Sequence, residues 1–148
     1  MENFLWILSL IGAFSIMEFL AWFTHKYIMH GFLWVLHKDH HKKDHKSRFE
    51  RNDTFFLFYA VVSMLFVISW SDYGFFYGLP IAIGIFLYGL TYFLVHDIFI
   101  HQRFKIFRNI DNKYARGVRR AHKIHHKNIN KEGGECFGML FVPKKYFK

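Results

Sequence analysis

Hydrophobic residues gather in three long segments of the chain. These are residues 3–23 (NFLWILSLIGAFSIMEFLAWF), 54–70 (TFFLFYAVVSMLFVISW) and 73–95 (YGFFYGLPIAIGIFLYGLTYFLV). A helix needs about 20 apolar residues to cross the core of a membrane, with about 17 as the lower limit. The pattern therefore predicts an all-α integral membrane protein with about three transmembrane helices. One alternative is that these segments are buried helices of a soluble bundle. Another is a fourth short span or re-entrant piece, if the third segment breaks near Pro80.

Positive charge occupies only the polar remainder of the chain. Seven Lys and Arg residues lie in 25–53 and thirteen in 96–148, which accounts for all 20. Positive residues collect on the cytoplasmic side of membrane proteins. Three spans with the N-terminus outside would therefore bring both basic segments to that side. We expect this face to contact anionic lipid headgroups, and its charge could also steer an acidic protein partner. Nucleic-acid binding is not expected, because the basic residues flank spans and no nucleic-acid fold is visible.

Histidines follow the same division and repeat a spacing. The His-rich segments, 25–45 and 96–126, each contain HxxxxH followed by HxxHH. Ten of the 11 histidines belong to this pattern, and we take the remaining one, His45, as a spare surface residue. The ten are His25, His30, His37, His40, His41, His96, His101, His122, His125 and His126.

The two spacings have different meanings on a helix. Residues at i, i+3 and i+4 share one face, so the three imidazoles of HxxHH can converge on a metal ion. Residues at i and i+5 point about 140° apart on an α-helix. The HxxxxH pairs could then flank a site from two directions, or a local π-bulge could bring each pair together.

Ten imidazoles at duplicated spacing predict a site for two metal ions. Imidazole suits Zn, Cu, Fe and Ni. A basic, His-rich surface that binds anionic lipid would not need repeated spacing. The single cysteine, Cys136, excludes an internal disulfide and a Cys-based zinc cage. Glu18 is the one ionisable residue well inside a span; it either pairs with a polar group of another helix or serves the site as a supporting or proton-relay group.

The sequence around the histidines resembles a known family. The segments HKYIMHGFLWVLHKDHH, LVHDIFIHQRF, RRAHKIHH and CFGMLFVP closely resemble the bacterial-type β-carotene hydroxylases, which belong to the fatty acid hydroxylase superfamily of membrane-bound, histidine-ligated di-iron enzymes. The resemblance covers about 17–143. The HxxHH boxes are shared across the superfamily, whereas the text around them is more specific to the carotenoid branch. We expect residues 1–148 to form one membrane hydroxylase domain.

The resemblance implies a reaction and its cofactors. The family inserts one oxygen atom of O₂ at C3 of a β-ionone ring, converting β-carotene to β-cryptoxanthin and then to zeaxanthin. The implied cofactors are two iron ions bound by the ten histidines, which zinc could replace in a purified sample. Electrons would come from an external donor, usually a ferredoxin and its reductase. The implied location is the bacterial inner membrane, with the active site on the cytoplasmic side and the apolar carotenoid reaching it from the lipid.

Acidic residues beside the histidines are candidates for a supporting role. Anions around a metal site orient the ring N–H groups of its histidines and temper the charge of the metal. Asp39 precedes His40, and Asp97 follows His96. The alternative is that both are solvated surface acids near basic residues.

Two other functions use the same features. A di-iron hydroxylase or desaturase of fatty acids or sterols would need the same histidines. A membrane metal-binding or transport protein without catalysis is the third hypothesis. Transporters usually place their ligands near the membrane midplane, whereas the histidines here lie at or beyond the ends of the predicted spans.

Overall fold

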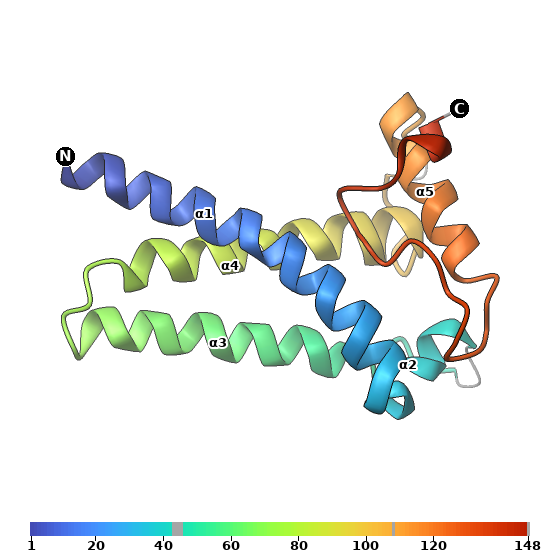
Figure 1. Ribbon diagram of the computed structural model, residues 1–148, viewed down its shortest axis with the longest axis horizontal. Helices are drawn as coiled ribbons and strands as arrows, with labels where there is room; N and C mark the ends of the chain where they lie inside the picture. Colours follow the sequence, from blue (N-terminus) through green and yellow to red (C-terminus); the bar gives the residue numbers. More distant parts are fainter. Residues whose placement is uncertain (43–45, 108, 148) are drawn as a thin grey trace. The chain divides into compact units, whose positions relative to one another are not determined.

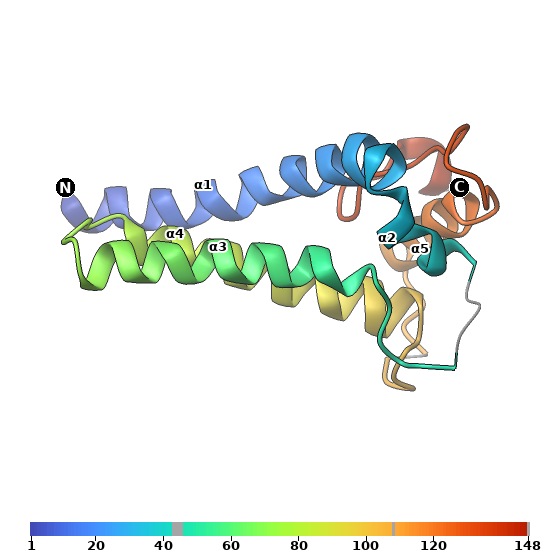
Figure 2. The same ribbon diagram turned by 90° about the horizontal axis from the view of Figure 1, so that it is seen from below.

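The computed structural model describes residues 1–42, 46–107 and 109–147, and this part of the chain contains helices and no strands. Its helices, shown in Figures 1 and 2, are listed here in chain order: α1 (Glu2–Phe23), the π-helix η1 (Thr24–Phe32), α2 (Trp34–His41), α3 (Asp53–Ser71), α4 (Gly78–Tyr92), the π-helix η2 (Phe93–Ile100), α5 (Lys113–His125) and the 3₁₀ turn η3 (Lys144–Phe147).

Three of the described helical stretches are long and apolar enough to cross a membrane. They are Glu2–Phe32, Asp53–Ser71 and Gly78–Ile100. The prediction of an all-α membrane fold is therefore confirmed, with three stretches in the described residues that are long and apolar enough to span. The alternative of a break near Pro80 with a fourth span is not found in the described residues, because Pro80 lies in the first turn of α4, where its missing N–H costs nothing.

The chain divides into two compact units. The first comprises Met1–Met17 and Thr54–Thr91, and the second Glu18–Asp53 and Tyr92–Lys148. Every described histidine belongs to the second unit.

Small residues allow close helix packing in the first unit. The backbone of α4 approaches α1 so closely at Gly84 that an added Cβ would lie 2.8 Å from the Cβ of Ala13. The hydroxyl of Ser63 in α3 donates a hydrogen bond to the carbonyl of Ala82 in α4, at 2.9 Å. Small and hydroxyl-bearing residues are typical of contacts between membrane helices, where burial of apolar area gives little driving force.

The second unit is built around polar side chains. Helix α5 begins at a cap in which the side chain of Asn112 accepts a hydrogen bond from the N–H of Ala115, at 2.8 Å. Its buried face includes Val118 and Ala121 as well as histidines, and η3 packs against it. The histidines of α2 and α5 are thus held inside the unit.

Candidate metal centre

Two π-helical segments bring together the histidines that are five residues apart. The N–H of His101 donates to the carbonyl of His96, at 2.9 Å, which is the i→i+5 bond of a π-helix. The ring centroids of His96 and His101 lie 4.5 Å apart, and those of His25 and His30 lie 5.3 Å apart. Of the two geometries left open by the HxxxxH spacing, the structure has the π form.

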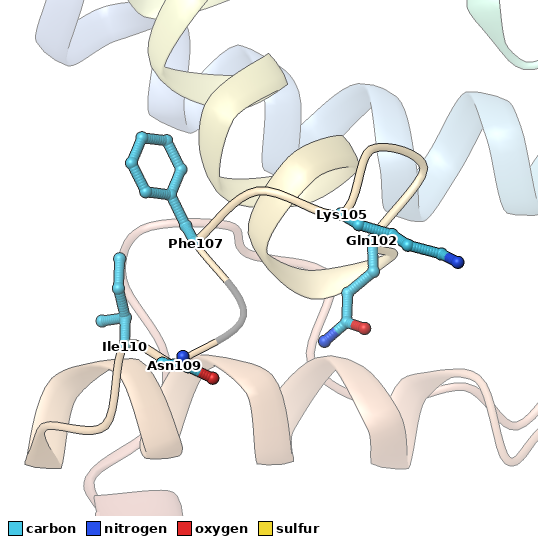
Figure 3. Close-up of a pocket in the computed structure, with 5 residues that line it drawn as sticks. All are labelled: Gln102, Lys105, Phe107, Asn109 and Ile110. Atoms are coloured by element: carbon cyan, nitrogen blue, oxygen red, sulfur yellow. The ribbon is translucent and has the colours of Figure 1, made fainter.

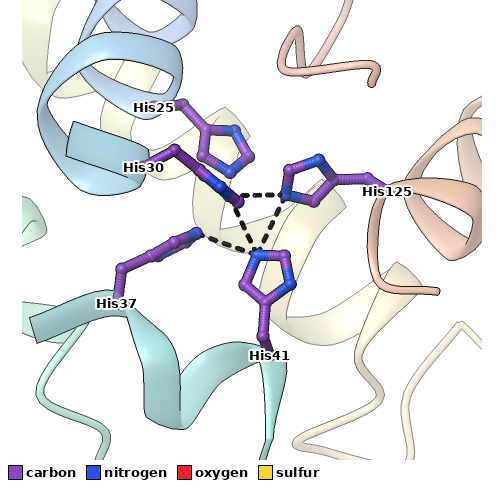
Figure 4. A group of neighbouring side chains, drawn as sticks. All are labelled: His25, His30, His37, His41 and His125. Carbon is purple, nitrogen blue, oxygen red and sulfur yellow. Dashed lines mark hydrogen bonds between the residues drawn. The ribbon is translucent and has the colours of Figure 1, made fainter. Parts of the chain in front are cut away.

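Nine histidines form two groups in which each residue offers one ring nitrogen. Within a group these atoms all lie within 4.8 Å of one another. The five-histidine group, drawn in Figure 4, consists of His25, His30, His37, His41 and His125. The four-histidine group consists of His40, His101, His122 and His126. The tenth, His96, lies against the four-histidine group, with its ring centroid 4.8 Å from those of His40 and His122.

Each HxxHH box is shared between the two groups. In α2, His37 and His41 belong to the five-histidine group, whereas His40 belongs to the other. At the end of α5, His122 and His126 belong to the four-histidine group and His125 crosses to the five-histidine group. The expectation that all three imidazoles of a box converge on one ion is therefore not met by this geometry. Residues four apart stay together, and the third member of each box faces the opposite group.

Hydrogen bonds fix which ring nitrogen of the five-histidine group carries the hydrogen. Backbone carbonyls, which can only accept, lie against the Nδ1 atoms of four members, at 2.9–3.0 Å. The Nδ1 of the fifth, His37, lies 2.6 Å from the side-chain oxygen of Asn52. Each ring therefore donates its Nδ1–H, and in the neutral form its Nε2 is left with a bare lone pair. The four pairs of histidine and carbonyl are His25 with Phe137, His30 with Lys131, His41 with Asn128, and His125 with Glu135.

The bare Nε2 atoms face one another. His41 Nε2 lies 3.1 Å from the Nε2 atoms of His30, His37 and His125 (dashed in Figure 4). Burial, reinforced by neighbouring histidines, lowers the pKa of His41 to about 4 and that of His125 to about 3. These rings are neutral at pH 7, and with every Nδ1–H already committed no hydrogen remains for the Nε2 contacts.

This arrangement fits a metal ion. Neutral imidazoles with Nδ1–H held by oxygen atoms and Nε2 directed inward are the usual form of a histidine ligand. The Nε2 atoms of His25, His40 and His126 are also buried, with no hydrogen-bond partner among the described residues. Leaving such atoms unsatisfied costs about 1–3 kcal/mol each. A cation in each group would satisfy these atoms, because His25 belongs to the five-histidine group and His40 and His126 belong to the four-histidine group.

Carboxylates support the four-histidine group. The Nδ1–H of His40 donates to Glu50, at 2.8 Å, and His96 Nδ1 lies 3.4 Å from Asp97. Burial, together with His96 next to each ring, lowers the pKa values of His40 and His122 well below 6.5. The two groups thus differ, because neutral oxygens hold the five-histidine group and anions lie beside the other.

One arginine joins these acids. The guanidinium of Arg103 is paired with Glu50 at 2.7 Å, Asp53 at 2.9 Å and Asp97 at 3.0 Å, and its side chain is only 13% exposed. A single planar cation thus holds three carboxylates in fixed positions, which suits the fork geometry of arginine.

The predicted supporting acids occupy different positions. Asp97 lies between His96 and Arg103, as described above. Asp39 is buried and accepts a hydrogen bond from the N–H of Arg51, at 2.8 Å, so it holds the backbone between Glu50 and Asn52. Neither Glu50 nor Asn52 was predicted, because no spacing in the sequence marks them. His45 lies outside the described residues.

A surface hollow in the second unit is distinct from the histidine groups. Figure 3 shows its lining residues, none of which is a histidine: Gln102, Lys105, Phe107, Asn109 and Ile110. It is open and partly polar, so we do not assign the chemistry of the histidines to it.

Comparison with known proteins identifies the family. Residues 10–143 match the family model described as fatty acid hydroxylase. The chain belongs to the fatty acid hydroxylase family. Within it, the chain is 38% identical to a "Beta-carotene hydroxylase" of a Paracoccus species, over 97% of the chain and 86% of the relative. It is 40% identical to the "Beta-carotene hydroxylase" of Pantoea ananas, over 94% of the chain and 80% of the relative.

The family extends beyond bacteria. A "Beta-carotene 3-hydroxylase 1, chloroplastic" of Arabidopsis thaliana is 36% identical over 91% of the chain and 44% of the longer relative. No solved structure gives a significant match. These findings confirm the family resemblance seen in the sequence.

Proposed function

We propose that the protein is a β-carotene 3-hydroxylase, which converts β-carotene to β-cryptoxanthin and then to zeaxanthin. The observation that carries this proposal is the pair of inward-facing imidazole groups, in a chain that covers most of the length of bacterial beta-carotene hydroxylases. The spanning helices suit an apolar substrate that is dissolved in the membrane.

The ten histidines would hold two iron ions. The five-histidine group would bind one, and the four-histidine group with His96 beside it would bind the other. Bound iron would supply the oxidising power to insert one atom of O₂ into a ring C–H bond, while the second atom leaves as water after two electrons and two protons are delivered. Zinc would fit the same imidazoles without supplying this chemistry.

The protein's own residues prepare the site in three ways. Backbone carbonyls and Asn52 hold the imidazoles in one tautomer. The carboxylates of Glu50 and Asp97 place negative charge beside the second group, and Arg103 limits that charge. Burial keeps the rings neutral.

Electrons would come from a ferredoxin and its reductase. The support for this is the basic polar segments, which complement an acidic carrier and also suit anionic lipid. The distribution of Lys and Arg favours the cytoplasmic side of the inner membrane for the site. The proposal treats residues 1–148 as one hydroxylase domain, and the family match across residues of both compact units supports this.

A second candidate is a hydroxylase or desaturase of fatty acids or sterols. The description of the family model favours it, and it would use the same histidines. The third hypothesis is a metal-binding protein without catalysis. It predicts bound metal in the purified protein and no hydroxylated product.

Pigment analysis distinguishes these three hypotheses. The protein is expressed in a bacterium that accumulates β-carotene, with a ferredoxin and its reductase supplied, and carotenoids are resolved by liquid chromatography. We expect β-cryptoxanthin and zeaxanthin, and their absence from a His40→Ala variant present in the membrane in equal amount. Unchanged β-carotene with metal-loaded wild-type protein would contradict the proposal, and a lipid extract from the same cells would then show whether fatty acids or sterols are modified.

A further inference from the structure

A carboxylate in the first helix holds the tail of the chain. Glu18 lies in α1 and is buried. Its Oε1 atom accepts hydrogen bonds from three consecutive backbone N–H groups, those of Met139 at 3.2 Å, Leu140 at 2.9 Å and Phe141 at 3.0 Å. Hydrogen bonds from backbone N–H to a carboxylate are stronger than those between neutral groups. The described hydrogen bonds thus give this acid a polar partner in the backbone of residues 139–141.

The turn that presents these three N–H groups depends on a glycine. A Cβ added to Gly138 would lie 2.6 Å from the carbonyl oxygen of Phe141 and 3.8 Å from Glu18 Oε1. The backbone therefore closes tightly around residues 138–141, leaving no room for a side chain. The carbonyl of Leu140 in the same turn accepts a hydrogen bond from the Tyr114 hydroxyl, at 2.7 Å.

The same stretch of chain orients the five-histidine group. Residues 128–137 supply all four carbonyls that receive an Nδ1–H from this group. The last of them, Phe137, lies one residue before Gly138, and its ring packs against His25, His30 and His125 at centroid distances of 5.1–5.4 Å. The hydrogen bonds described for the four-histidine group come from other parts of the chain: Glu50 accepts from His40, and Asp97 lies beside His96.

We propose that Glu18 is a positioning residue for the five-histidine group alone. By fixing the turn at 138–141 it seats the tail segment, 128–141, whose carbonyls set the tautomer and direction of four imidazoles. The inference rests on the proposed metal site. In this proposal the tail segment, which is far from η1 in the sequence, completes one of the two metal positions.

Metal content of the purified protein tests the inference without reference to catalysis. The variants are Glu18→Gln, Glu18→Ala and Gly138→Ala, with Glu2→Gln as a matched control at the exposed end of the same helix. Loss of groups that orient metal ligands typically costs 10–100-fold in affinity, so Glu18→Ala should bind about one metal ion per chain where the wild type binds about two. Glu18→Gln, which keeps an acceptor oxygen, should fall between them.

Trypsin provides a second measurement on the same samples. Lys127 and Lys131 flank the start of the tail segment and are exposed, so release of the segment should speed cleavage there in Glu18→Ala and Gly138→Ala. Because both residues act through one turn, the double variant should lose no more metal than Glu18→Ala alone.

Three results would overturn the inference. Glu18→Ala could retain both ions with an uncut tail, or it could lose both ions together, which would indicate general destabilisation. Additive loss in the double variant would show that the two residues act separately. A wild-type protein without metal would instead remove the proposed function itself, and with it the site that the inference serves. Should Glu18→Ala fail to accumulate in the membrane, Gly138→Ala provides the same two measurements, and Glu18→Gln provides them with a smaller expected loss.

Discussion

At the scale of single residues, the chemistry of the site depends on which nitrogen of each imidazole carries the hydrogen. An acceptor at Nδ1 fixes the ring so that the Nε2 lone pair points into the site. Replacing that acceptor therefore alters the metal-binding properties of the histidine although the histidine itself is unchanged. The acceptors beside His37 and His40 are the side chains of Asn52 and Glu50. Replacing them should therefore affect metal binding.

Asn52 gives the first test. Replacing it with Leu removes the acceptor of the 2.6 Å bond to His37, and we expect metal affinity at the five-histidine group to fall by about 10–100-fold. Asn52→Asp, which retains an acceptor oxygen, should stay close to wild type. Competition with a chelator measures the affinity. The control is Asn109→Leu, at an exposed residue that lines the surface hollow; equal affinity in the Asn52 and Asn109 variants would contradict the assignment.

Arg103 gives a test of stability. Its removal leaves three carboxylates without their shared cation, and breaking a buried ion pair from one side costs about 3–5 kcal/mol. We therefore expect Arg103→Gln to lower the unfolding temperature strongly. Arg116→Gln is the matched control, because its pair with Asp111 is mostly exposed and such pairs contribute about 0–1 kcal/mol. Thermal unfolding in detergent compares them, and similar losses in both variants would show that the network around Arg103 adds little.

The sequence predicts the residues of the site better than their partners. All ten boxed histidines could be selected, because duplicated spacing marks them. Asn52 could not, because its relation to His37 depends on how the chain returns after α2. Asp39 looked equivalent to Asp97 from its neighbour in sequence, yet its described hydrogen bond is to the backbone of Arg51.

At the scale of elements, the arrangement of α2 and α5 makes a prediction about pairs of histidines. His37 and His125 lie in one group although they come from different boxes, whereas His37 and His122 lie in different groups. The double variant His37→Ala/His125→Ala should then lose one metal ion, as each single variant does. His37→Ala/His122→Ala should lose both.

Measuring the metal content of these variants, purified from membranes, tests whether each HxxHH box is shared between the two groups. If each box instead bound its own ion, His37→Ala/His40→Ala would lose one ion. Sharing of the boxes between the groups predicts the loss of both. The sequence could not predict the crossing. Helical spacing places three imidazoles on a shared face, but only the packing of α2 against its surroundings decides which neighbour each one meets.

The same two helices make stability depend on pH. Burial, modified by neighbouring groups, lowers the pKa of His37 and His126 to about 2, of His125 to about 3 and of His41 to about 4. In the unfolded chain these residues have a pKa of about 6.5. Below that pH the unfolded chain binds more protons than the folded one, so stability falls as the pH drops; above it, neither state is charged there and this contribution is flat.

We therefore expect the unfolding temperature of the metal-free protein to be nearly constant between pH 7.5 and 8.5. It should decline steadily from about pH 6.5 towards pH 4. Thermal unfolding across buffers of equal ionic strength measures this. His37→Gln should show a shallower decline, since one of the groups is gone. A flat profile down to pH 5 would mean that these rings are not buried as the structure shows.

Spanning helices were the most predictable elements. The second predicted span, 54–70, corresponds to α3 at Asp53–Ser71, because hydropathy alone selects such a segment. The third was predicted from Tyr73, but α4 begins at Gly78. The aromatic residues between Tyr73 and Gly78 have the hydropathy of a spanning helix. Gly74, however, has a φ of 67°, a turn conformation that hydropathy averaged over a segment does not detect.

At the scale of the whole molecule, metal ions would join parts of the chain that are distant in sequence. Each histidine group draws residues from both 25–41 and 101–126. Metal bound only by the folded state adds RT ln(1 + [L]/Kd) to stability, about 4 kcal/mol when the free metal is at a thousand times Kd. Without metal, the buried Nε2 lone pairs face one another with no partner. This increases the difference in stability between the metal-bound and the metal-free protein.

Chelation should therefore lower the unfolding temperature of the purified protein, and added Fe²⁺ or Zn²⁺ should restore it. The control is His37→Ala/His122→Ala, which lacks a member of each group and should respond little to the chelator. Zinc-restored protein should recover its stability but not its hydroxylation of β-carotene, because Zn²⁺ has no redox chemistry. If chelation removed the metal with no change in unfolding, the histidine groups would be set by the protein alone, and the metal would not take part in holding the two segments together.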